Sequence, residues 1–387
     1  MTLHRKRKIC VVITARPSYA RIRSVLEALR GREDVELQII LVASALLERY
    51  GRVEQVIERD GFEVNWRISS LLEGESLLSS AKSTATGLLE TATALANLTP
   101  DVVVTIADRF ETIATAIAAS YQNIPLAHIQ GGEVTGNIDD KVRHAITKLA
   151  DLHLVASDGA AARVVSMGEI PERVIITGCP SIDISRAAQA SPRLDGDVFT
   201  QFGGVGKTFD LSGQFIVVMQ HPVTTEHDQA FNQATETLHA IRDLKIPTLW
   251  FWPNVDAGSD ATAKAIRVFR ERYPLRTVHF FRSMPPEDFN RLLVDAAAIV
   301  GNSSAAIREC AYLGTPAINI GSRQSGRERG PNVIDVEYDR TAIGETLRAQ
   351  LAHGRYPSSN IYGDGTAGPR IANELTTRPL TLKTPGQ

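Results

Sequence analysis

Short, continuously apolar segments alternate with longer stretches of helical character through most of the chain, and this alternation restricts the possible folds more than any other feature. The apolar segments of the first half are Ile9–Thr14, Glu36–Val42, Val102–Ile106, Pro125–Ile129, Leu152–Ala156 and Val174–Thr177. Most of them do not alternate apolar with polar residues, which is typical of parallel strands covered on both faces. Between them a helix is predicted from about residue 75 to residue 97, ending before Pro100. The pattern predicts a doubly wound α/β domain.

The alternation resumes in the second half, after a stretch rich in Pro, Gly, Ser and Asp. The predicted strands there are Phe215–Met219, Thr248–Trp252, Thr277–Phe281, Ala297–Val300 and Pro316–Ile320. A chain of 387 residues is long enough for two or three domains, each with its own core. We therefore expect two Rossmann-like domains with a cleft between them. The predicted parts are an N-terminal domain over 1–186, a linker over 187–213, a C-terminal domain over 214–365, and a final helix and tail over 366–387.

The composition argues against several classes of protein. The formal net charge of −2 is unlike that of a protein that binds nucleic acid or an anionic membrane surface. The three cysteines lie far apart without a C-x-x-C pair, so we expect no disulfide framework and a reducing compartment. No apolar stretch approaches the roughly 20 residues that span a bilayer, and no His, Cys or carboxylate group has metal-ligand spacing. We expect a cytoplasmic protein without a structural metal.

Two glycine-rich segments match nucleotide-binding motifs by letter only. The segment 203–208 resembles the end of a P-loop, but Gln201 stands where that motif needs glycine, and a polar linker explains it better. The segment 363–368 reads G-x-G-x-x-G but lacks a preceding strand, so we interpret it as a turn before a short final helix. No nicotinamide cofactor is implied.

Polar side chains follow several predicted strands of the first half, where open α/β sheets bind their ligands. Arg16 follows the first strand, where a guanidinium can clamp phosphate oxygens, although it could equally cap a helix. Asp108 and Arg109 follow another strand, and an N-cap role would also explain the aspartate. Paired glycines lead to Glu133, and Asp139 begins a helix. Their convergence favours an active site with acid–base chemistry by carboxylates.

The second half offers groups suited to a nucleotide. His221 follows the first strand of this half. Ser303 and Ser304 stand between a strand and a helix, where backbone N–H groups and the helix dipole favour phosphate, although an ordinary N-cap is equally compatible. Glu309 is placed to accept two ribose hydroxyls, and Arg323 is placed to meet phosphate or sugar.

These motifs together resemble the hydrolysing UDP-N-acetylglucosamine 2-epimerases of sialic-acid and related nonulosonate biosynthesis. The matching segments are 108–111, 130–140, 143–148, 178–181, 220–225, 253–258, 301–304, 323–328 and 362–365. The resemblance covers nearly the whole chain. It implies the glycosyltransferase-B architecture, in which the last helix crosses back to the first domain, and a homo-oligomer that is a dimer or tetramer.

The resemblance also implies the reaction and the roles of individual residues. A base removes the C2 proton, UDP leaves C1, and water adds to the glycal to give free N-acetylmannosamine, without a cofactor. Asp108 and Asp139 would handle protons near C2 and C1, and Glu309 would hold the ribose. The diphosphate would be held by Arg16, Arg109, His221, Ser303, Ser304 and Arg323. Asn254 and Asp256 would line the second-domain wall.

Three positions near the expected sugar pocket depart from the pattern of this family. Gln130 replaces a titratable residue, so either Glu133 takes a proton role or the site relies on Asp108 and Asp139. Ala45 replaces a histidine, and residues 106–107 replace a His-Gly type pair.

The departures bear on which sugar the site accepts. A smaller Ala45 would leave volume beside the hexose, and Gln130 can donate and accept hydrogen bonds. We predict UDP-N-acetylglucosamine as the substrate, with a UDP-2,4-diacetamido-trideoxyhexose as the alternative. A non-hydrolysing epimerase, a glycosyltransferase and a silent nucleotide-sugar binder are competing hypotheses for the same motifs.

Overall fold

The computed structural model of the protein describes residues 5–47, 53–72, 77–106, 111–135, 138–194, 196–253 and 258–383. The chain forms two compact units. The first, called here the first domain, contains the chain up to residue 133, residues 138–183 and the segment from 363 onward. The second, called the second domain, contains residues 184–362 together with the segment that begins at Val134.

The first domain is built on a seven-stranded sheet in the order β3-β2-β1-β4-β5-β6-β7, in which every neighbouring pair is parallel. The strands are β1 (Arg7–Ile13), β2 (Val35–Val42), β3 (Trp66–Ile68), β4 (Val102–Ile106), β5 (Leu126–Ile129), β6 (Leu152–Val155) and β7 (Val174–Ile176). The six strands predicted for this half are confirmed. The short β3 was not predicted.

Both faces of this sheet are covered, as the apolar strands predicted. Ile9, Val11 and Ile13 of β1 face one core, and the intervening Cys10 and Val12 face another. Helices of the first core are α1 (Arg16–Arg30), α2 (Val53–Arg59) and α15 (Ala367–Thr377), and helices of the second are α3 (Leu77–Leu98), α4 (Thr112–Tyr121) and α5 (Ile138–Leu149). Also present are η1 (Ala43–Leu46), α6 (Asp158–Ser166), η3 (Pro171–Arg173) and α7 (Pro180–Ala190).

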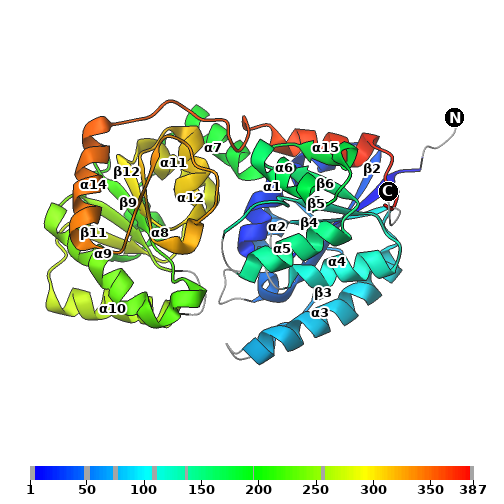
Figure 1. The fold of residues 1–387 in the computed structure, drawn as a ribbon, viewed down its shortest axis with the longest axis horizontal. Coiled ribbons are helices and arrows are strands. Elements are labelled where there is room, and N and C mark those ends of the chain that lie inside the picture. Colours follow the sequence, from blue (N-terminus) through cyan, green and yellow to red (C-terminus); the bar gives the residue numbers. More distant parts are fainter. Residues whose placement is uncertain are drawn as a thin grey trace. The chain divides into compact units, whose positions relative to one another are not determined.

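The final helix returns to the first domain and packs against α1 (Figure 1). Its start is held by Asp183, whose carboxylate accepts hydrogen bonds from the backbone N–H groups of Ala367 (2.9 Å) and Gly368 (2.7 Å). At its other end, Arg7 donates to the carbonyl oxygens of Leu375 (2.8 Å) and Arg378 (2.9 Å). The predicted return of the last helix is therefore confirmed.

The second domain is built on another seven-stranded sheet, in the order β14-β13-β12-β9-β10-β11-β8. Its strands are β8 (Val205–Gly206), β9 (Ile216–Met219), β10 (Thr248–Phe251), β11 (Val278–Phe281), β12 (Ala298–Gly301), β13 (Ala317–Ile320) and β14 (Val333–Val336). All pairs are parallel except β8 with β11. The five predicted strands are confirmed, so both domains have the doubly wound α/β fold.

The stretch 187–213, predicted as a linker, contains α8 (Val198–Phe202) and the edge strand β8. Val198 and Phe199 belong to a core of the second domain. In β8 the φ of Gly206 is 135°, and a Cβ atom there would lie 2.3 Å from the carbonyl oxygen of Val278. The glycines that resemble a P-loop therefore serve the close pairing of an edge strand.

The helices of the second domain also cover both faces of its sheet (Figure 1). They are η4 (Thr224–Gln229), α9 (Ala230–Leu244), α10 (Ser259–Arg272), α11 (Pro286–Asp295), α12 (Ser304–Ile307), α13 (Glu309–Leu313), η5 (Ser322–Gln324) and α14 (Arg340–His353). The short helices α12 and α13 are separated at Arg308, where φ is −94° and ψ is −68°. Within the described ranges, no helix is long and apolar enough to cross a membrane.

Candidate functional site

The strand order places the candidate site at the carboxyl ends of the strands. The strand order turns around between β1 and β4 in the first sheet and between β9 and β12 in the second. Ligands of open α/β sheets bind at such positions, so the loops after these strands are the ones that matter. Four predicted site residues, Asp108, Arg109, Asn254 and Asp256, lie outside the described residues.

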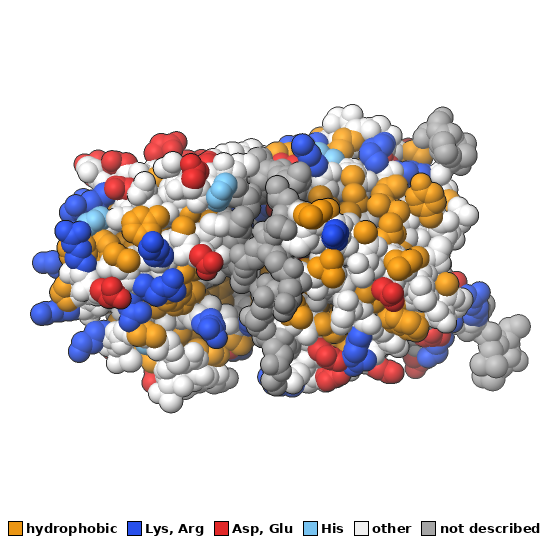
Figure 2. Space-filling model, turned by 90° about the horizontal axis from the view of Figure 1, so that it is seen from below, with side chains coloured by type: hydrophobic (Ala, Val, Ile, Leu, Met, Phe, Trp, Pro, Cys, Tyr) orange, Lys and Arg blue, Asp and Glu red, His pale blue; other side chains and the backbone are white. Residues whose placement is uncertain are grey.

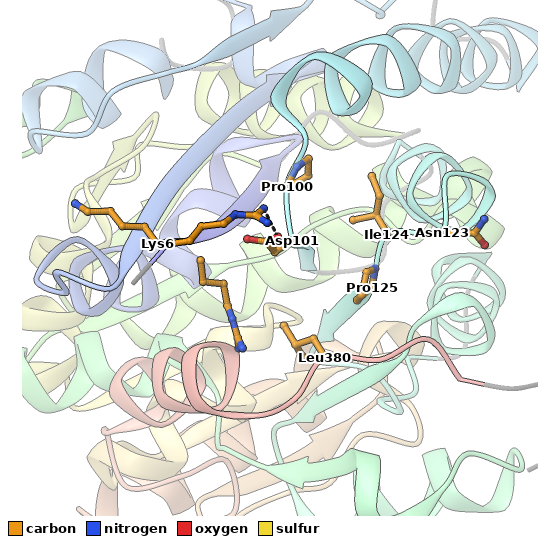
Figure 3. Close-up of a pocket in the computed structure, with 9 residues that line it drawn as sticks. Lys6, Pro100, Asp101, Asn123, Ile124, Pro125 and Leu380 are labelled. Carbon is orange, nitrogen blue, oxygen red and sulfur yellow. Dashed lines mark hydrogen bonds and ion pairs between the residues drawn. The ribbon is translucent and has the colours of Figure 1, made fainter. Parts of the chain in front are cut away.

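A surface pocket of the first domain lies at the opposite edge of the sheet. It has a volume of about 520 Å³ and is lined by residues that precede β1, β4 and β5, among them Lys6, Asp101 and Pro125 (Figure 3). Asp101 accepts a hydrogen bond from Arg5 at 2.7 Å. Because this pocket lies at the amino ends of the strands, we do not assign the reaction to it.

The turn after β5 requires its two glycines. A Cβ atom on Gly131 would lie 2.9 Å from Nδ1 of His128, and one on Gly132 would lie 2.3 Å from the carbonyl oxygen of Ala160. Gly132 has a φ of 77°, and Gln130 has a φ of 65°, which is uncommon for a residue with a side chain. The turn ends at Glu133, which is buried. The paired glycines thus form a tight turn that leads to Glu133.

Arginine side chains hold this turn in place. Arg143, which is 1% exposed, donates to the carbonyl oxygen of Glu133 and to Oδ1 of Asp140, both at 2.6 Å. Arg163 donates to the carbonyl oxygen of Gly132. Asp139 stands beside Asp140 in the first turn of α5. The structure therefore ties the Glu133 turn to the helix start that carries Asp139.

Gln130 lies buried at the same turn and is held by a thiol. Its Nε2 donates to Sγ of Cys179 at 2.9 Å, and this sulfur lies 3.0 Å from Oγ of Ser181. Its Oε1 is buried and has no hydrogen-bond partner among the described residues. A buried carbonyl oxygen without a partner is costly, so Oε1 is an acceptor suited to a ligand donor.

The loops after β1 and β2 correct one expectation. Ala45 has no exposed surface and its side chain belongs to the first core, so it opens no volume for a sugar. The carbonyl oxygen of Thr14 accepts hydrogen bonds from N of Ala45 (3.1 Å) and Oγ of Ser44 (3.0 Å), which joins the two loops. Arg16 is half-buried and begins α1, whose first turn carries no acidic side chain.

In the second domain, Asn302 organises the loops that follow β9, β12 and β13. Its Oδ1 accepts from N of His221 at 2.7 Å, and its Nδ2 donates to O of His221 at 2.8 Å. Its carbonyl oxygen accepts from Arg323 (3.2 Å) and from Nε2 of Gln324 (2.9 Å). The structure thus brings the predicted His221 and Arg323 together. Sequence reasoning noticed the Asn-Ser-Ser motif but gave Asn302 no role.

The environment of His221 keeps its imidazole neutral at neutral pH. Burial holds the pKa of His221 well below its ordinary value, and the Arg323 guanidinium lowers this pKa further. The hydroxyl of Tyr338 also accepts a hydrogen bond from Asn302, at 3.3 Å. Burial raises the pKa of Tyr338 to about 12. A neutral imidazole beside a permanent guanidinium charge suits the binding of an anion.

The loop after β12 supplies hydroxyl and carboxylate groups. Ser303 is the N-cap of α12, and its Oγ accepts from N of Ala305 at 3.3 Å, while Ser304 begins the helix. Glu309 begins α13, and its Oε2 is buried without a hydrogen-bond partner among the described residues. Between them, the guanidinium of the buried Arg308 lies 5.8 Å from the ring centroid of Tyr362.

Known proteins match most of this chain in sequence. Residues 27–376 match the family described as UDP-N-acetylglucosamine 2-epimerase. The chain belongs to the UDP-N-acetylglucosamine 2-epimerase family. The resemblance predicted from the sequence motifs is therefore confirmed at the level of the family.

Three relatives within this family cover most of the chain. The UDP-N,N'-diacetylbacillosamine 2-epimerase (hydrolyzing) of Legionella pneumophila is 35% identical, over 97% of both chains. The GDP/UDP-N,N'-diacetylbacillosamine 2-epimerase (hydrolyzing) of Campylobacter jejuni is 30% identical, over 86% of this chain and 85% of its own. The UDP-N-acetylglucosamine 2-epimerase of Neisseria meningitidis is 29% identical, over 99% and 98%.

A solved structure of the family supports the fold. The UDP-GlcNAc 2-epimerase of Methanocaldococcus jannaschii, in complex with UDP-GlcNAc and UDP, matches with a TM-score of 0.79. The match covers 95% of this chain and 99% of that one at 16% sequence identity. The two Rossmann-like domains of the predicted glycosyltransferase-B architecture are thus confirmed as the fold of this chain.

The two sets of loops differ in the chemistry they offer such an enzyme. The first domain presents carboxylates, Glu133 and Asp139, on backbone that arginines hold. The second presents a neutral imidazole, a guanidinium and hydroxyl groups around Asn302. Carboxylates can move protons, whereas cationic and N–H donors bind a diphosphate.

Proposed function

We propose that this member of the family is a hydrolysing 2-epimerase that acts on UDP-N,N'-diacetylbacillosamine, a UDP-2,4-diacetamido-trideoxyhexose. The observation that carries the proposal is the 35% identity to the Legionella pneumophila enzyme over 97% of both chains, because that enzyme's name states both hydrolysis and this substrate. The Campylobacter jejuni relative points the same way.

The reaction would proceed by elimination and hydration. A carboxylate removes the proton from C2, the C1–O bond to UDP breaks, and a double bond forms between C1 and C2. Water then adds its hydroxyl group to C1 while C2 regains a proton on the opposite face, which gives the free 2-epimerised sugar. Asp108, Glu133 and Asp139 are the carboxylates that this scheme assigns to proton transfer.

The nucleotide would be held mainly by the second domain. His221, Ser303, Ser304 and Arg323 would bind the diphosphate, together with Arg16 and Arg109 of the first domain. Glu309 would accept hydroxyl groups of the ribose, which fits the unpartnered Oε2 of its side chain. Asn254 and Asp256 would line the wall of the second domain.

The choice of sugar rests on Gln130 as well as on the relatives. Because Cys179 holds Nε2 of this side chain, the free Oε1 can only accept a hydrogen bond. The N–H of an acetamido group at C4 is such a donor, and it cannot act as an acceptor. This reverses the ranking made from sequence, which placed UDP-N-acetylglucosamine first and relied in part on the volume beside Ala45.

UDP-N-acetylglucosamine is the second candidate, because the Neisseria meningitidis relative bears that substrate in its name. The specificity constants kcat/KM for the two UDP-sugars distinguish the candidates. We expect a preference of more than about tenfold for the diacetamido sugar, because UDP-N-acetylglucosamine has at C4 only a hydroxyl group, which can donate to Oε1 of Gln130 but lacks the geometry of an amide N–H. Equal constants, or a preference for UDP-N-acetylglucosamine, would overturn this choice of substrate.

The type of reaction is tested separately, by incubating each UDP-sugar in deuterated water and following the products by NMR. Release of free UDP with a free, C2-deuterated and 2-epimerised sugar is the expected result. An intact, epimerised UDP-sugar would indicate a non-hydrolysing epimerase. No turnover without an acceptor would indicate a glycosyltransferase or a silent binder.

A further inference from the structure

Gln130 is held on a backbone that leaves its side chain little freedom. Its N–H donates to the carbonyl oxygen of Leu154 at 3.0 Å, which continues the pairing of β5 with β6, and its φ is 65°. The residue is buried, with 2% of its surface exposed. A backbone conformation of this kind persists where neighbouring contacts enforce it, and such residues cluster at functional sites. The terminal amide is therefore the part of Gln130 that neighbouring side chains still have to orient.

Cys179 lies on the loop after β7, within hydrogen-bond distance of that amide. Before it, the N–H groups of Thr177 and Gly178 both donate to the carbonyl oxygen of Val155, at 3.0 and 3.3 Å, which joins the loop to the end of β6. Cys179 has no exposed surface, and α7 begins directly after it at Pro180. The thiol is thus fixed from both sides, by a paired loop before it and a helix after it.

A row of three side chains joins the two loops. Nε2 of Gln130 donates to Sγ of Cys179 at 2.9 Å, and Oγ of Ser181 lies 3.0 Å from the same sulfur. A thiol carries a single proton. When that proton is donated to Ser181, the lone pairs of the sulfur face Gln130 and can only accept, so they pair with the amide N–H. The row therefore decides which end of the amide faces the sulfur and which end faces away from it.

The orientation of the amide matters because its two ends offer opposite hydrogen-bonding groups. With Nε2 on the sulfur, the other end is Oε1, which is buried without a hydrogen-bond partner among the described residues. An amide turned end for end would present N–H donors instead. The N–H of an acetamido group can pair only with the oxygen, whereas a hydroxyl group donates or accepts and can pair with either end. Fixing the oxygen toward the ligand therefore favours the acetamido group and makes little difference to a hydroxyl group.

Surface charge cannot make this distinction between sugars. Both candidate sugars are attached to the same UDP group, so the two substrates have the same charge and differ only in uncharged substituents, including the one at C4. Charged side chains of both signs are scattered over the face of the molecule drawn in Figure 2. The distinction therefore needs a buried, uncharged group of fixed direction, and the amide of Gln130 is such a group.

We propose that Cys179 and Ser181 are positioning residues that set the sugar preference, because they lock the amide of Gln130 with its oxygen toward the C4 substituent. This role rests on the proposed function of the chain as an epimerase of UDP-sugars. Neither residue has to touch the substrate, since both act through Gln130. Their removal should therefore change which sugar is preferred, rather than only the overall rate.

The measured quantity is the ratio of kcat/KM for UDP-N,N'-diacetylbacillosamine to kcat/KM for UDP-N-acetylglucosamine, in the wild type and in Cys179→Ala. Alanine removes the acceptor of Nε2, so the amide can turn, and the ratio should fall by about fivefold or more, the effect of one hydrogen bond. Cys179→Ser keeps a group that accepts and donates at the same place, so its ratio should stay within about twofold of the wild type. An unchanged ratio in Cys179→Ala would overturn the proposal.

Cys10→Ala is the matched control. Cys10 is also a buried thiol of the first domain, but it lies within β1 and belongs to a hydrophobic core. Its replacement should lower Tm without changing the ratio, since a loss of folded enzyme lowers both specificity constants equally. An equal fall of the ratio in Cys10→Ala and Cys179→Ala would assign the change to packing and overturn the role of the thiol.

Ser181→Ala tests the same row from its far end and leaves the thiol in place. The thiol proton can then turn toward Gln130 and pair with the amide oxygen, so the ratio should fall, though by less than in Cys179→Ala. A wild-type ratio in Ser181→Ala would overturn the role of Ser181. The choice of substrate is judged separately, from the ratio of the wild type alone. A wild type that turns over neither sugar would overturn the proposed function and the positioning role together.

Discussion

The two domains share the order of six parallel strands but position their loops by different means. In the first domain, guanidinium groups of Arg143 and Arg163 bind backbone carbonyl oxygens of the Gly132–Glu133 turn from outside. In the second, the amide of Asn302 lies inside the loops and pairs with both backbone groups of His221. In the proposed mechanism, the first arrangement would leave carboxylates for proton transfer, whereas the second would leave cationic and polar groups for an anion. Under this proposal the loops, rather than the topology, give the two similar domains their different roles.

Removing a carboxylate of the first domain is the strongest test of the proposed roles of the two domains. Glu133→Gln should lower kcat by about 10²–10⁴, because an amide cannot exchange a proton. UDP affinity, measured by calorimetry, should stay within about twofold of the wild type because the backbone of the turn is unchanged. If Glu133→Gln lowers the affinity for UDP but leaves the single-turnover rate unchanged, the assignment of proton transfer to the first domain and of nucleotide binding to the second is wrong.

The corresponding change in the second domain is Asn302→Ala. It removes the side-chain bonds to His221, each worth about 1 kcal/mol, and should raise the Kd for UDP by roughly 10- to 100-fold. The control is Asn332→Ala. The amide of Asn332, just before β14, is also buried, but it donates to the carbonyl oxygen of Thr315. That variant should lose stability without losing UDP affinity. Equal UDP affinities in the two variants would deny Asn302 its role.

Arg143→Lys tests whether the arginine that holds the Glu133 turn in the first domain affects the reaction rate. In the wild type a single nitrogen, Nη1 of Arg143, donates to both Glu133 and Asp140. Lysine keeps the charge but carries it on a shorter and more flexible stem, so kcat should fall about tenfold with little change in KM. Arg173→Lys is the matched control, since Arg173 binds the carbonyl oxygen of Asp151 before β6. A role confined to stability would lower Tm in both variants and leave both kcat values unchanged.

Glu309→Ala should weaken UDP binding by about five- to tenfold, the loss expected for one hydrogen bond to ribose. Single-turnover chemistry on saturated enzyme should change less. Glu309→Gln keeps one acceptor oxygen. Its affinity for UDP should therefore lie between those of the wild type and the alanine variant. Unchanged UDP affinity in calorimetry would remove the ribose role.

The smallest expected effect is on the pH dependence of stability. Because the pKa of His221 is lower in the folded chain, the unfolded chain binds more protons below the ordinary histidine pKa of about 6.5. This contribution is fully present above that pH and is lost as pH falls toward the folded pKa, by up to about 1.4 kcal/mol per pH unit.

Urea unfolding of wild type and His221→Gln between pH 7.5 and 5.5 measures this effect. The variant should have the flatter profile, and subtraction of the two curves removes the contributions of the remaining histidines. Parallel curves would show that His221 does not carry the pH dependence.

The long, buried elements were predictable because their patterns are strong. Strands covered on both faces, such as β4, are wholly buried, and the periodicity of α3 is clear over many turns. The missed strands are short and partly exposed: β3 contains the exposed Arg67, and β14 carries exposed residues at its centre. Tertiary pairing, rather than local preference, makes such segments extended.

The sequence predicted the residues of the candidate site better than the hydrogen bonds that join its loops. Motifs singled out Glu133, His221 and Arg323, but the amide of Asn302 acts through contacts with distant loops that no spacing reveals. Ala45 shows the opposite failure, because sequence position near a loop does not tell which way a side chain points. The break at Arg308 was also hidden, since no glycine or proline marks it.

The return of α15 to the first domain has a consequence for biosynthesis. Ile371 and Leu375 complete a core whose buried members outside this helix lie before residue 160, so a ribosome must synthesise more than 200 further residues before that core can close. This segment is grouped with the first domain, so the second domain can form earlier. At roughly 5–20 residues per second, the nascent first domain waits with an uncovered apolar surface for many seconds. A premature stop before α15 would therefore leave a complete second domain joined to a first domain whose apolar core is exposed and prone to aggregation.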